Sequence, residues 1–103
     1  MDKIVQIGLL GFGTVGTGVV RVLTDNSQLI AQRAGTAITI NKILVRDLKK
    51  KRALSTAAEL TTEPAAVIGD PEIDIVVELL GGEEPARTLM LEALNHGKHV
   101  VTA

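Results

Sequence analysis

The sequence has no cysteine, a single aromatic residue and almost no excess of charge of either sign. Its formal net charge is −1, and Phe12 is the only aromatic side chain among 103 residues. The lack of cysteine excludes disulfides, thiolate chemistry and cysteine-ligated metal clusters. Proteins that bind nucleic acid usually present a basic face or stacking rings, so this composition argues against a nucleic-acid partner.

Long apolar runs are missing as well. No stretch approaches the roughly 20 apolar residues that a membrane-spanning helix needs, and the N-terminus enters a strand-like segment without the pattern of a signal peptide. We therefore expect a cytoplasmic protein with no membrane partner. The length fits one domain.

The apolar residues that are present are almost entirely aliphatic, and Val and Ile gather in four short runs. Such runs are typical of strands that are buried on both faces of a parallel sheet. The expected strands cover residues 4–10, 38–45, 73–80 and 98–103.

Helical patterns lie between these runs. Thr14 is placed to cap the first helix, and Pro64 suits the first turn of the second. Glu83 and Glu84 open the third, where negative charge interacts favourably with the helix dipole. The expected helices cover residues 14–35 with a break at 25–27, then a short segment that starts at 62–64 and is ended by 69–71, and finally residues 83–95. Residues 48–62 have no clear pattern.

The alternation of strands and helices predicts an α/β fold with right-handed crossovers. We expect a Rossmann-like three-layer sandwich whose parallel sheet has the strand order 3-2-1-4. In this prediction the sheet is truncated after the fourth strand, at residues 98–103.

A glycine-rich loop joins the first strand to the first helix. Gly11-Phe12-Gly13-Thr14-Val15-Gly16 matches G-x-G-x-x-G in the strand-to-helix context that dinucleotide-binding domains require. In this motif Gly11 permits the turn, Gly13 lets a pyrophosphate approach, and Gly16 allows close helix–strand packing. Free amides at the helix N-terminus would face the anion. The alternative is a glycine turn that only packs.

The end of the second strand, Val45-Arg46-Asp47, bears on the choice of cofactor. An acidic residue there binds the ribose hydroxyls of NAD, whereas an arginine accommodates the 2′-phosphate of NADP. Arg46 comes first and the basic run 49–52 follows, which favours NADP, with NAD as the alternative. We expect at least two residues of that run to be solvated.

The later strands also end in candidate positions. Gly81 and Gly82 follow the third strand, and Thr102-Ala103 ends the fourth, where open α/β sheets bind ligands. Glu78 fits either a hydrogen-bonded buried carboxylate or a site residue. No catalytic residue and no metal site is predicted, since no nucleophile–base pair and no metal-ligand spacing is visible.

Four blocks of the sequence together resemble the cofactor domain of homoserine dehydrogenases. The blocks are G-L-L-G-F-G-T-V-G-T-G-V (8–19), V-R-D (45–47), D-I-V-V-E-L-L-G-G (74–82) and G-K-H-V-V-T-A (97–103). The resemblance implies oxidation of L-homoserine to L-aspartate 4-semialdehyde with NAD(P)⁺, or the reverse reduction, in threonine, methionine and isoleucine biosynthesis.

The resemblance also implies roles for single residues. Phe12, Gly13, Thr14 and Val15 would hold the pyrophosphate and the neighbouring ribose, and Arg46 would meet the 2′-phosphate. The path toward the nicotinamide would be lined by Gly81, Gly82, Thr102 and Ala103.

By the same resemblance, residues 1–103 form a partial NAD(P)-binding domain. The catalytic lysines and the domain that binds the small-molecule substrate would lie beyond Ala103. We therefore expect this chain alone to be inactive, and the intact enzyme to be a homo-oligomer through the later domain. Two alternatives are another Rossmann oxidoreductase, of the aspartate-dehydrogenase or sugar-oxidoreductase type, and a non-catalytic module that senses NAD(H).

Overall fold

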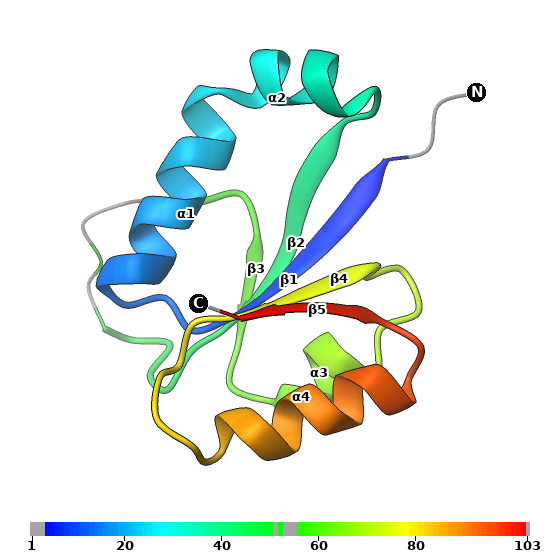
Figure 1. The fold of residues 1–103 in the computed structure, drawn as a ribbon. Coiled ribbons are helices and arrows are strands. Elements are labelled where there is room, and N and C mark those ends of the chain that lie inside the picture. The colour runs from blue at the N-terminus through cyan, green and yellow to red at the C-terminus, as the bar shows by residue number, and fades with distance from the viewer. Residues whose placement is uncertain (1–3, 51, 53–55, 103) are drawn as a thin grey trace.

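One parallel sheet forms the centre of the molecule, seen in a computed structural model that describes residues 4–50, 52 and 56–102 (Figure 1). Its order is β3-β2-β1-β4-β5, and every neighbouring pair is parallel. The strands are β1 (Val5–Leu10), β2 (Ile38–Leu44), β3 (Glu59–Thr61), β4 (Ile75–Glu78) and β5 (His99–Thr102).

The expected α/β, Rossmann-like fold is confirmed, but the sheet has five strands among the described residues. The order begins 3-2-1-4, yet its third strand is Glu59–Thr61, in a segment where no strand was expected. The run at 73–80 is therefore β4, which pairs with β1, and the run at 98–103 is β5. The predicted number of four strands was wrong, because β3 has only three residues and shows no pattern in the sequence.

Helices cover both faces of the sheet and complete three layers (Figure 1). One pair lies on one face and the other pair on the opposite face. The first pair is α1 (Thr14–Asp25) and α2 (Ser27–Ala34), and the second is α3 (Pro64–Ile68) and α4 (Ala86–Asn95).

Two helix starts differ from expectation. Thr14 was expected to cap α1, but Thr14 is already helical, the N-cap is Gly13, and no described side chain caps this end. Helix α4 begins at Ala86, so Glu83 and Glu84 precede its first turn. The Glu84 carboxylate nevertheless accepts a hydrogen bond from the Thr88 amide at 3.1 Å, which satisfies one free donor there.

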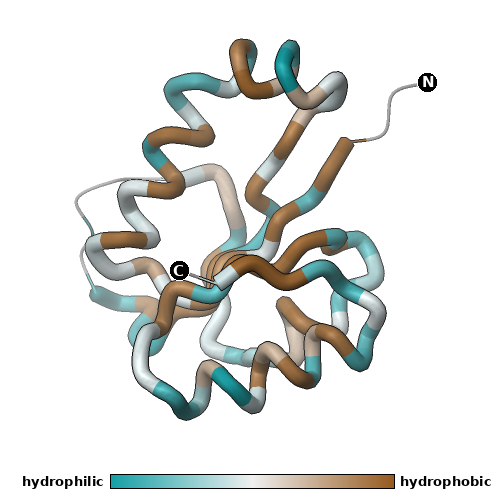
Figure 2. The backbone as a smooth tube through the Cα atoms, viewed as in Figure 1, coloured by the Kyte–Doolittle hydropathy of each residue, from teal (hydrophilic) through white to brown (hydrophobic). Residues whose placement is uncertain are grey.

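Apolar side chains of the strands alternate between two cores, one on each side of the sheet. Hydrophobic residues accordingly dominate the central strands (Figure 2). Leu9 and Ile43 pack toward α1, whereas their neighbours Leu10 and Leu44 pack toward α3 and α4. This alternation follows from the two-residue period of a strand. Among the described residues, no helix is long and apolar enough to cross a bilayer.

The approach of α1 to β1 leaves no space for a side chain at Gly16. An ideal Cβ there would lie 2.5 Å from the carbonyl oxygen of Gly11, and Gly11 itself has a φ of +116°. Both positions therefore require glycine, one for space and the other for backbone conformation. These two glycines direct the N-terminus of α1 to the edge where β1 ends.

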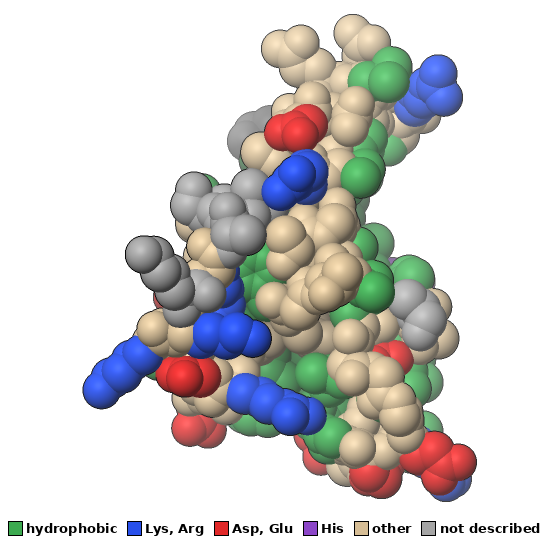
Figure 3. Space-filling view, turned by 90° about the vertical axis from the view of Figure 1, so that its left-hand side faces the viewer, with side chains coloured by type: hydrophobic (Ala, Val, Ile, Leu, Met, Phe, Trp, Pro, Cys, Tyr) green, Lys and Arg blue, Asp and Glu red, His purple; other side chains and the backbone are tan. Residues whose placement is uncertain are grey.

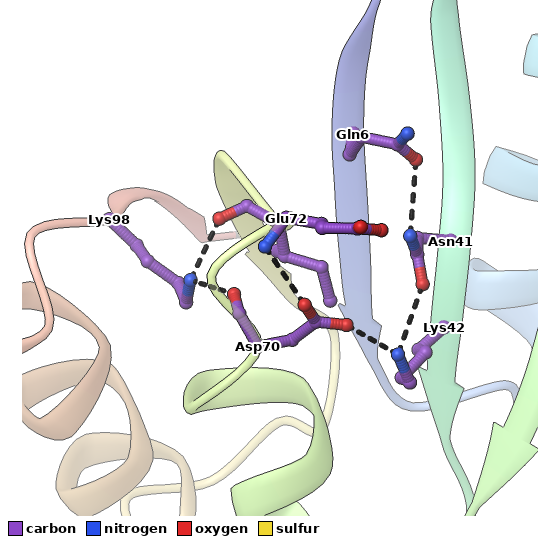
Figure 4. A network of polar contacts seen from close by, with 7 residues as sticks. Gln6, Asn41, Lys42, Asp70, Glu72 and Lys98 are labelled. Carbon is purple, nitrogen blue, oxygen red and sulfur yellow. Dashed lines mark hydrogen bonds and ion pairs between the residues drawn. The ribbon is translucent and has the colours of Figure 1, made fainter.

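Two lysines tie the turn after α3 to the sheet (Figure 4). Lys42 of β2 forms an ion pair with Asp70, and Lys98 donates hydrogen bonds to the carbonyls of Asp70 and Ile73 at 2.6 and 2.7 Å. The hydrogen bond to Asp70 raises the pKa of Lys42, and the same bond lowers the pKa of the Asp70 carboxyl. Both groups therefore stay charged over a wider pH range than usual.

Replacing Gly16 with alanine should destabilise the protein, whereas the same change at Gly18 should not. No described atom lies within 4 Å of an ideal Cβ at Gly18, which is exposed in the same helix. We expect Gly16→Ala to lower the free energy of unfolding by about 1–3 kcal/mol through overpacking. Gly18→Ala should raise it by about 0.5–1 kcal/mol through helix propensity. Urea denaturation followed by circular dichroism measures both, and equal effects would contradict the packing role of Gly16.

Candidate functional site

A cleft of about 520 Å³ opens at the edge where β1, β2, β3 and β4 end. The glycine loop forms one side of it, and the segment that follows β2 forms another. The lining residues are Gly11, Phe12, Gly13, Leu44, Val45, Arg46, Asp47, Lys50, Arg52, Thr62, Pro64, Leu79, Leu80, Pro85 and Leu89. Parallel α/β sheets bind ligands at this edge.

The structure brings together four of the eleven residues that the sequence predicts to bind the cofactor. Gly11, Phe12, Gly13 and Arg46 all line the cleft. Other candidates lie near it without lining it: Thr14 and Val15 are exposed in the first turn of α1, and Gly16 is buried beneath the loop. Gly81 and Gly82 follow β4, Thr102 ends β5, and Ala103 is outside the described residues.

The loop presents backbone donors to the cleft. The first amides of a helix have no acceptor within it, and within the described part of the chain no side chain caps α1. An ideal Cβ at Gly13 would have no described atom within 4 Å, so this face of the loop is open. The positive end of the helix dipole adds to the attraction for an anion.

Basic side chains gather on the face that carries this edge, beside apolar side chains (Figure 3). Arg46 and Lys50 line the cleft and are exposed. Asp47 lies between them in the sequence and carries the opposite charge. Its Oδ1 accepts a hydrogen bond from the Lys49 amide at 2.9 Å, which closes a local turn. The segment after β2 can therefore bring positive charge to a ligand.

The basic run is only partly solvated. Lys49 and Lys50 are exposed, which confirms the expectation for two of its residues, whereas Lys51 lies outside the described residues. Arg52 is half-buried and turns inward, with its guanidinium carbon 5.7 Å from the centre of the Phe12 ring. Sequence reasoning missed this placement because Phe12 lies forty positions earlier in the chain.

Glu78 is a hydrogen-bonded buried carboxylate, one of the two possibilities that the sequence left open. Its side chain is 3% exposed and accepts bonds from the amides of Leu80 at 2.6 Å and Gly81 at 3.1 Å and from the Thr102 hydroxyl at 2.7 Å. Burial alone would raise the pKa of Glu78, but the bonds from Thr102, Gly81 and Leu80 outweigh it and lower the pKa. Glu78 thus holds the turn after β4 to the end of β5.

Several lining residues carry no sequence signal that relates them to a binding site. Thr62 and Pro64 follow β3, while Pro85 and Leu89 belong to the start of α4. They reach the cleft because the sheet order places the ends of β3 and β4 on either side of β2 and β1. Only the strand order could have identified them.

Comparison with known proteins places the chain in one family. Residues 11–103 match the sequence family described as "Homoserine dehydrogenase, NAD binding domain". The homoserine dehydrogenase of Bacillus subtilis (strain 168) is 46% identical over 102 residues, which cover 98% of this chain and 24% of that protein. The homoserine dehydrogenase of Synechocystis sp. is 50% identical over 103 residues, 96% of this chain and 23% of that protein.

Solved structures agree with these relatives. A homoserine dehydrogenase from Thiobacillus denitrificans superposes with a TM-score of 0.92 at 52% identity, over 98% of this chain and 23% of that one. An S. aureus homoserine dehydrogenase gives 0.91 at 42% identity, over 98% and 26% of the two chains. The chain thus spans about a quarter of the length of the relatives that it matches.

The charge of Glu78 should make stability depend on pH. Because its pKa is lowered on folding, its stabilising effect is present above the ordinary pKa of about 4.3 and is lost as pH falls through the folded value. We expect Glu78→Gln to lower the free energy of unfolding at pH 7 by about 1–3 kcal/mol, and the gap to wild type to shrink below about pH 4. Exposed Glu92→Gln is the matched control. A gap that is the same at pH 7 and pH 3 would contradict a charged Glu78.

Proposed function

The chain belongs to the homoserine dehydrogenase family, and from that premise we propose that it binds a nicotinamide dinucleotide for the interconversion of L-homoserine and L-aspartate 4-semialdehyde. The observation that carries the proposal is the glycine loop, which opens α1 at the edge of a cleft that Arg46 also lines. The match over residues 11–103 includes this loop, Arg46, the Gly81-Gly82 turn and the end of β5.

The residues present fit such a cofactor. A dinucleotide needs a backbone surface that its pyrophosphate can approach closely, and no described atom fills the space beside Gly13. It also needs unpaired donors, which the uncapped first turn of α1 supplies. A cationic side chain, Arg46, stands where the ribose of the adenosine half is selected.

We assign the residues as follows. The amides of Phe12, Gly13, Thr14 and Val15 would hold the pyrophosphate and the adjoining ribose, and Gly11 and Gly16 shape the loop. Gly81, Gly82, Thr102 and Ala103 would line the path to the nicotinamide, which when bound supplies the hydride acceptor or donor.

We further propose that NADP is preferred and that NAD is the alternative. Arg46 is exposed in the cleft, and no described residue forms an ion pair with it. A guanidinium binds a phosphate through two parallel hydrogen bonds, which a ribose without the 2′-phosphate cannot reciprocate. Asp47 is the residue that would bind the ribose hydroxyls of NAD, but its Oδ1 already accepts a hydrogen bond from the Lys49 amide. This bond supports the preference for NADP.

Activity is proposed for the longer protein and not for this chain by itself. Hydride transfer requires a substrate held against the cofactor, and residues 1–103 represent the NAD(P)-binding part, about a quarter of the relatives. We propose that the substrate-binding residues, the catalytic groups and a homo-oligomeric interface belong to the remainder of a cytoplasmic enzyme. Neither nucleic acid nor a membrane is proposed as a partner.

Removing the Arg46 side chain should weaken the binding of NADPH selectively. We expect Arg46→Ala to reduce NADPH affinity about tenfold or more, the value of a charge-assisted hydrogen bond, while NADH affinity changes less than about twofold. Titration followed by nicotinamide fluorescence measures both constants. Arg33→Ala, at the exposed end of α2, is the control. Equal losses for the two cofactors would rule out the phosphate contact.

A methyl group at Gly13 should impair binding without unfolding the protein. Because an ideal Cβ there meets no described atom, Gly13→Ala should remain folded, at a cost of about 1 kcal/mol or less for alanine at the N-cap of α1. The same Cβ would occupy space that the pyrophosphate needs, so we expect about tenfold or greater loss of affinity for both NADH and NADPH. If the variant binds both as well as wild type, the assignment of the glycine loop is incorrect.

A further inference from the structure

Arg52 connects the segment that follows β2 to the glycine loop. Its Nη2 donates to the carbonyl of Asp47 at 2.7 Å, and its Nη1 donates to the carbonyl of Lys50 at 2.9 Å. The same guanidinium lies 5.7 Å from the centre of the Phe12 ring. One side chain therefore contacts two walls of the cleft that are far apart in the sequence.

These contacts distinguish Arg52 from the other cations of the cleft. Arg46 and Lys50 are exposed and can reach a ligand, whereas Arg52 is half-buried and both of its terminal nitrogens bind backbone carbonyls. Its Nε is fully buried, with no hydrogen-bond partner among the described residues. Each terminal nitrogen of Arg52 therefore has one of its N–H groups bound to the protein, which fixes the orientation of the guanidinium.

We propose that Arg52 is a positioning residue, which fixes the segment Asp47–Lys50 relative to Phe12 and so sets the shape of the cleft for both cofactors. The planar fork suits this task because it can donate to two carbonyls while one face rests on an aromatic ring. The proposal rests on the proposed function only where it concerns dinucleotide affinity. The link between the two segments stands on the contacts alone.

The link can be tested without any ligand, by amide hydrogen exchange on the chain. Arg52→Ala should speed exchange both in the segment Asp47–Lys50, whose carbonyls it binds, and in the loop Gly11–Gly13, because Phe12 loses its neighbour. Phe12→Leu should likewise speed exchange in Asp47–Lys50, and the double variant should add little to either single change. Arg33→Ala is the control. Unchanged exchange in the glycine loop of a folded Arg52→Ala would overturn the link.

The effect on binding separates a positioning residue from a phosphate ligand. We expect Arg52→Ala to weaken NADH and NADPH alike, by about three- to tenfold, the value of a partly desolvated cation–π contact. Arg52→Lys should not restore affinity, since an ammonium cannot match the fork. A loss confined to NADPH would make Arg52 a ligand of the 2′-phosphate, and full affinity for both would overturn the proposal.

The two proposals fail in different ways. If the wild-type chain binds neither NADH nor NADPH, the proposed function fails, while hydrogen exchange still decides whether Arg52 links the segments. If wild type binds both and Arg52→Ala binds them equally well, only the role of Arg52 fails. A single measurement on wild type therefore tells the two failures apart.

Discussion

The closeness of Gly16 to the carbonyl of Gly11 is the constraint on which the candidate site depends. An ideal Cβ on residue 16 would lie 2.5 Å from the Gly11 carbonyl oxygen, so α1 can begin this close to the end of β1 only because that residue is glycine. The helix then packs Val20 into the same core as Leu9 and Ile43. Its free amides consequently face the carboxyl edge of the sheet, where an anion can reach them.

The rest of that edge is held by two polar side chains of opposite character. The charged carboxylate of Glu78 can only accept hydrogen bonds, and it accepts them from the amides of Leu80 and Gly81, just after the end of β4. Arg52, which only donates, binds carbonyls in the segment that follows β2. Backbone groups lose their ladder partners where strands stop, and each unpaired group costs free energy if buried. Satisfying them with charged side chains fixes both sides of the cleft and leaves Arg46 and Lys50 available to a ligand.

Features that depend on residues close together in the sequence were predicted, whereas features that depend on contacts between distant residues were missed. Strand β1, helix α1 and the glycine loop were predicted because local period and glycine spacing specify them. Strand β3 was missed because Leu60 is its only large apolar residue, and pairing with β2 specifies it instead. The place of Arg52 was not predicted: the basic run 49–52 indicated NADP and at least two solvated residues, but a run carries no information about a distant ring. Glu78 stayed undecided until Thr102 and the following turn were placed beside it.

The arrangement after β2 bears on cofactor choice more directly than residue order does. Arg46 and Asp47 are adjacent, so the sequence offers both a phosphate ligand and a ribose ligand. In the folded chain the Asp47 carboxylate accepts the Lys49 amide, and the Asp47 carbonyl accepts Arg52. Asp47 is therefore held within its own turn, at one of its two carboxylate oxygens and at its carbonyl. Arg46 lines the cleft and forms no ion pair with a described residue, and this difference supports the proposal that NADP is preferred.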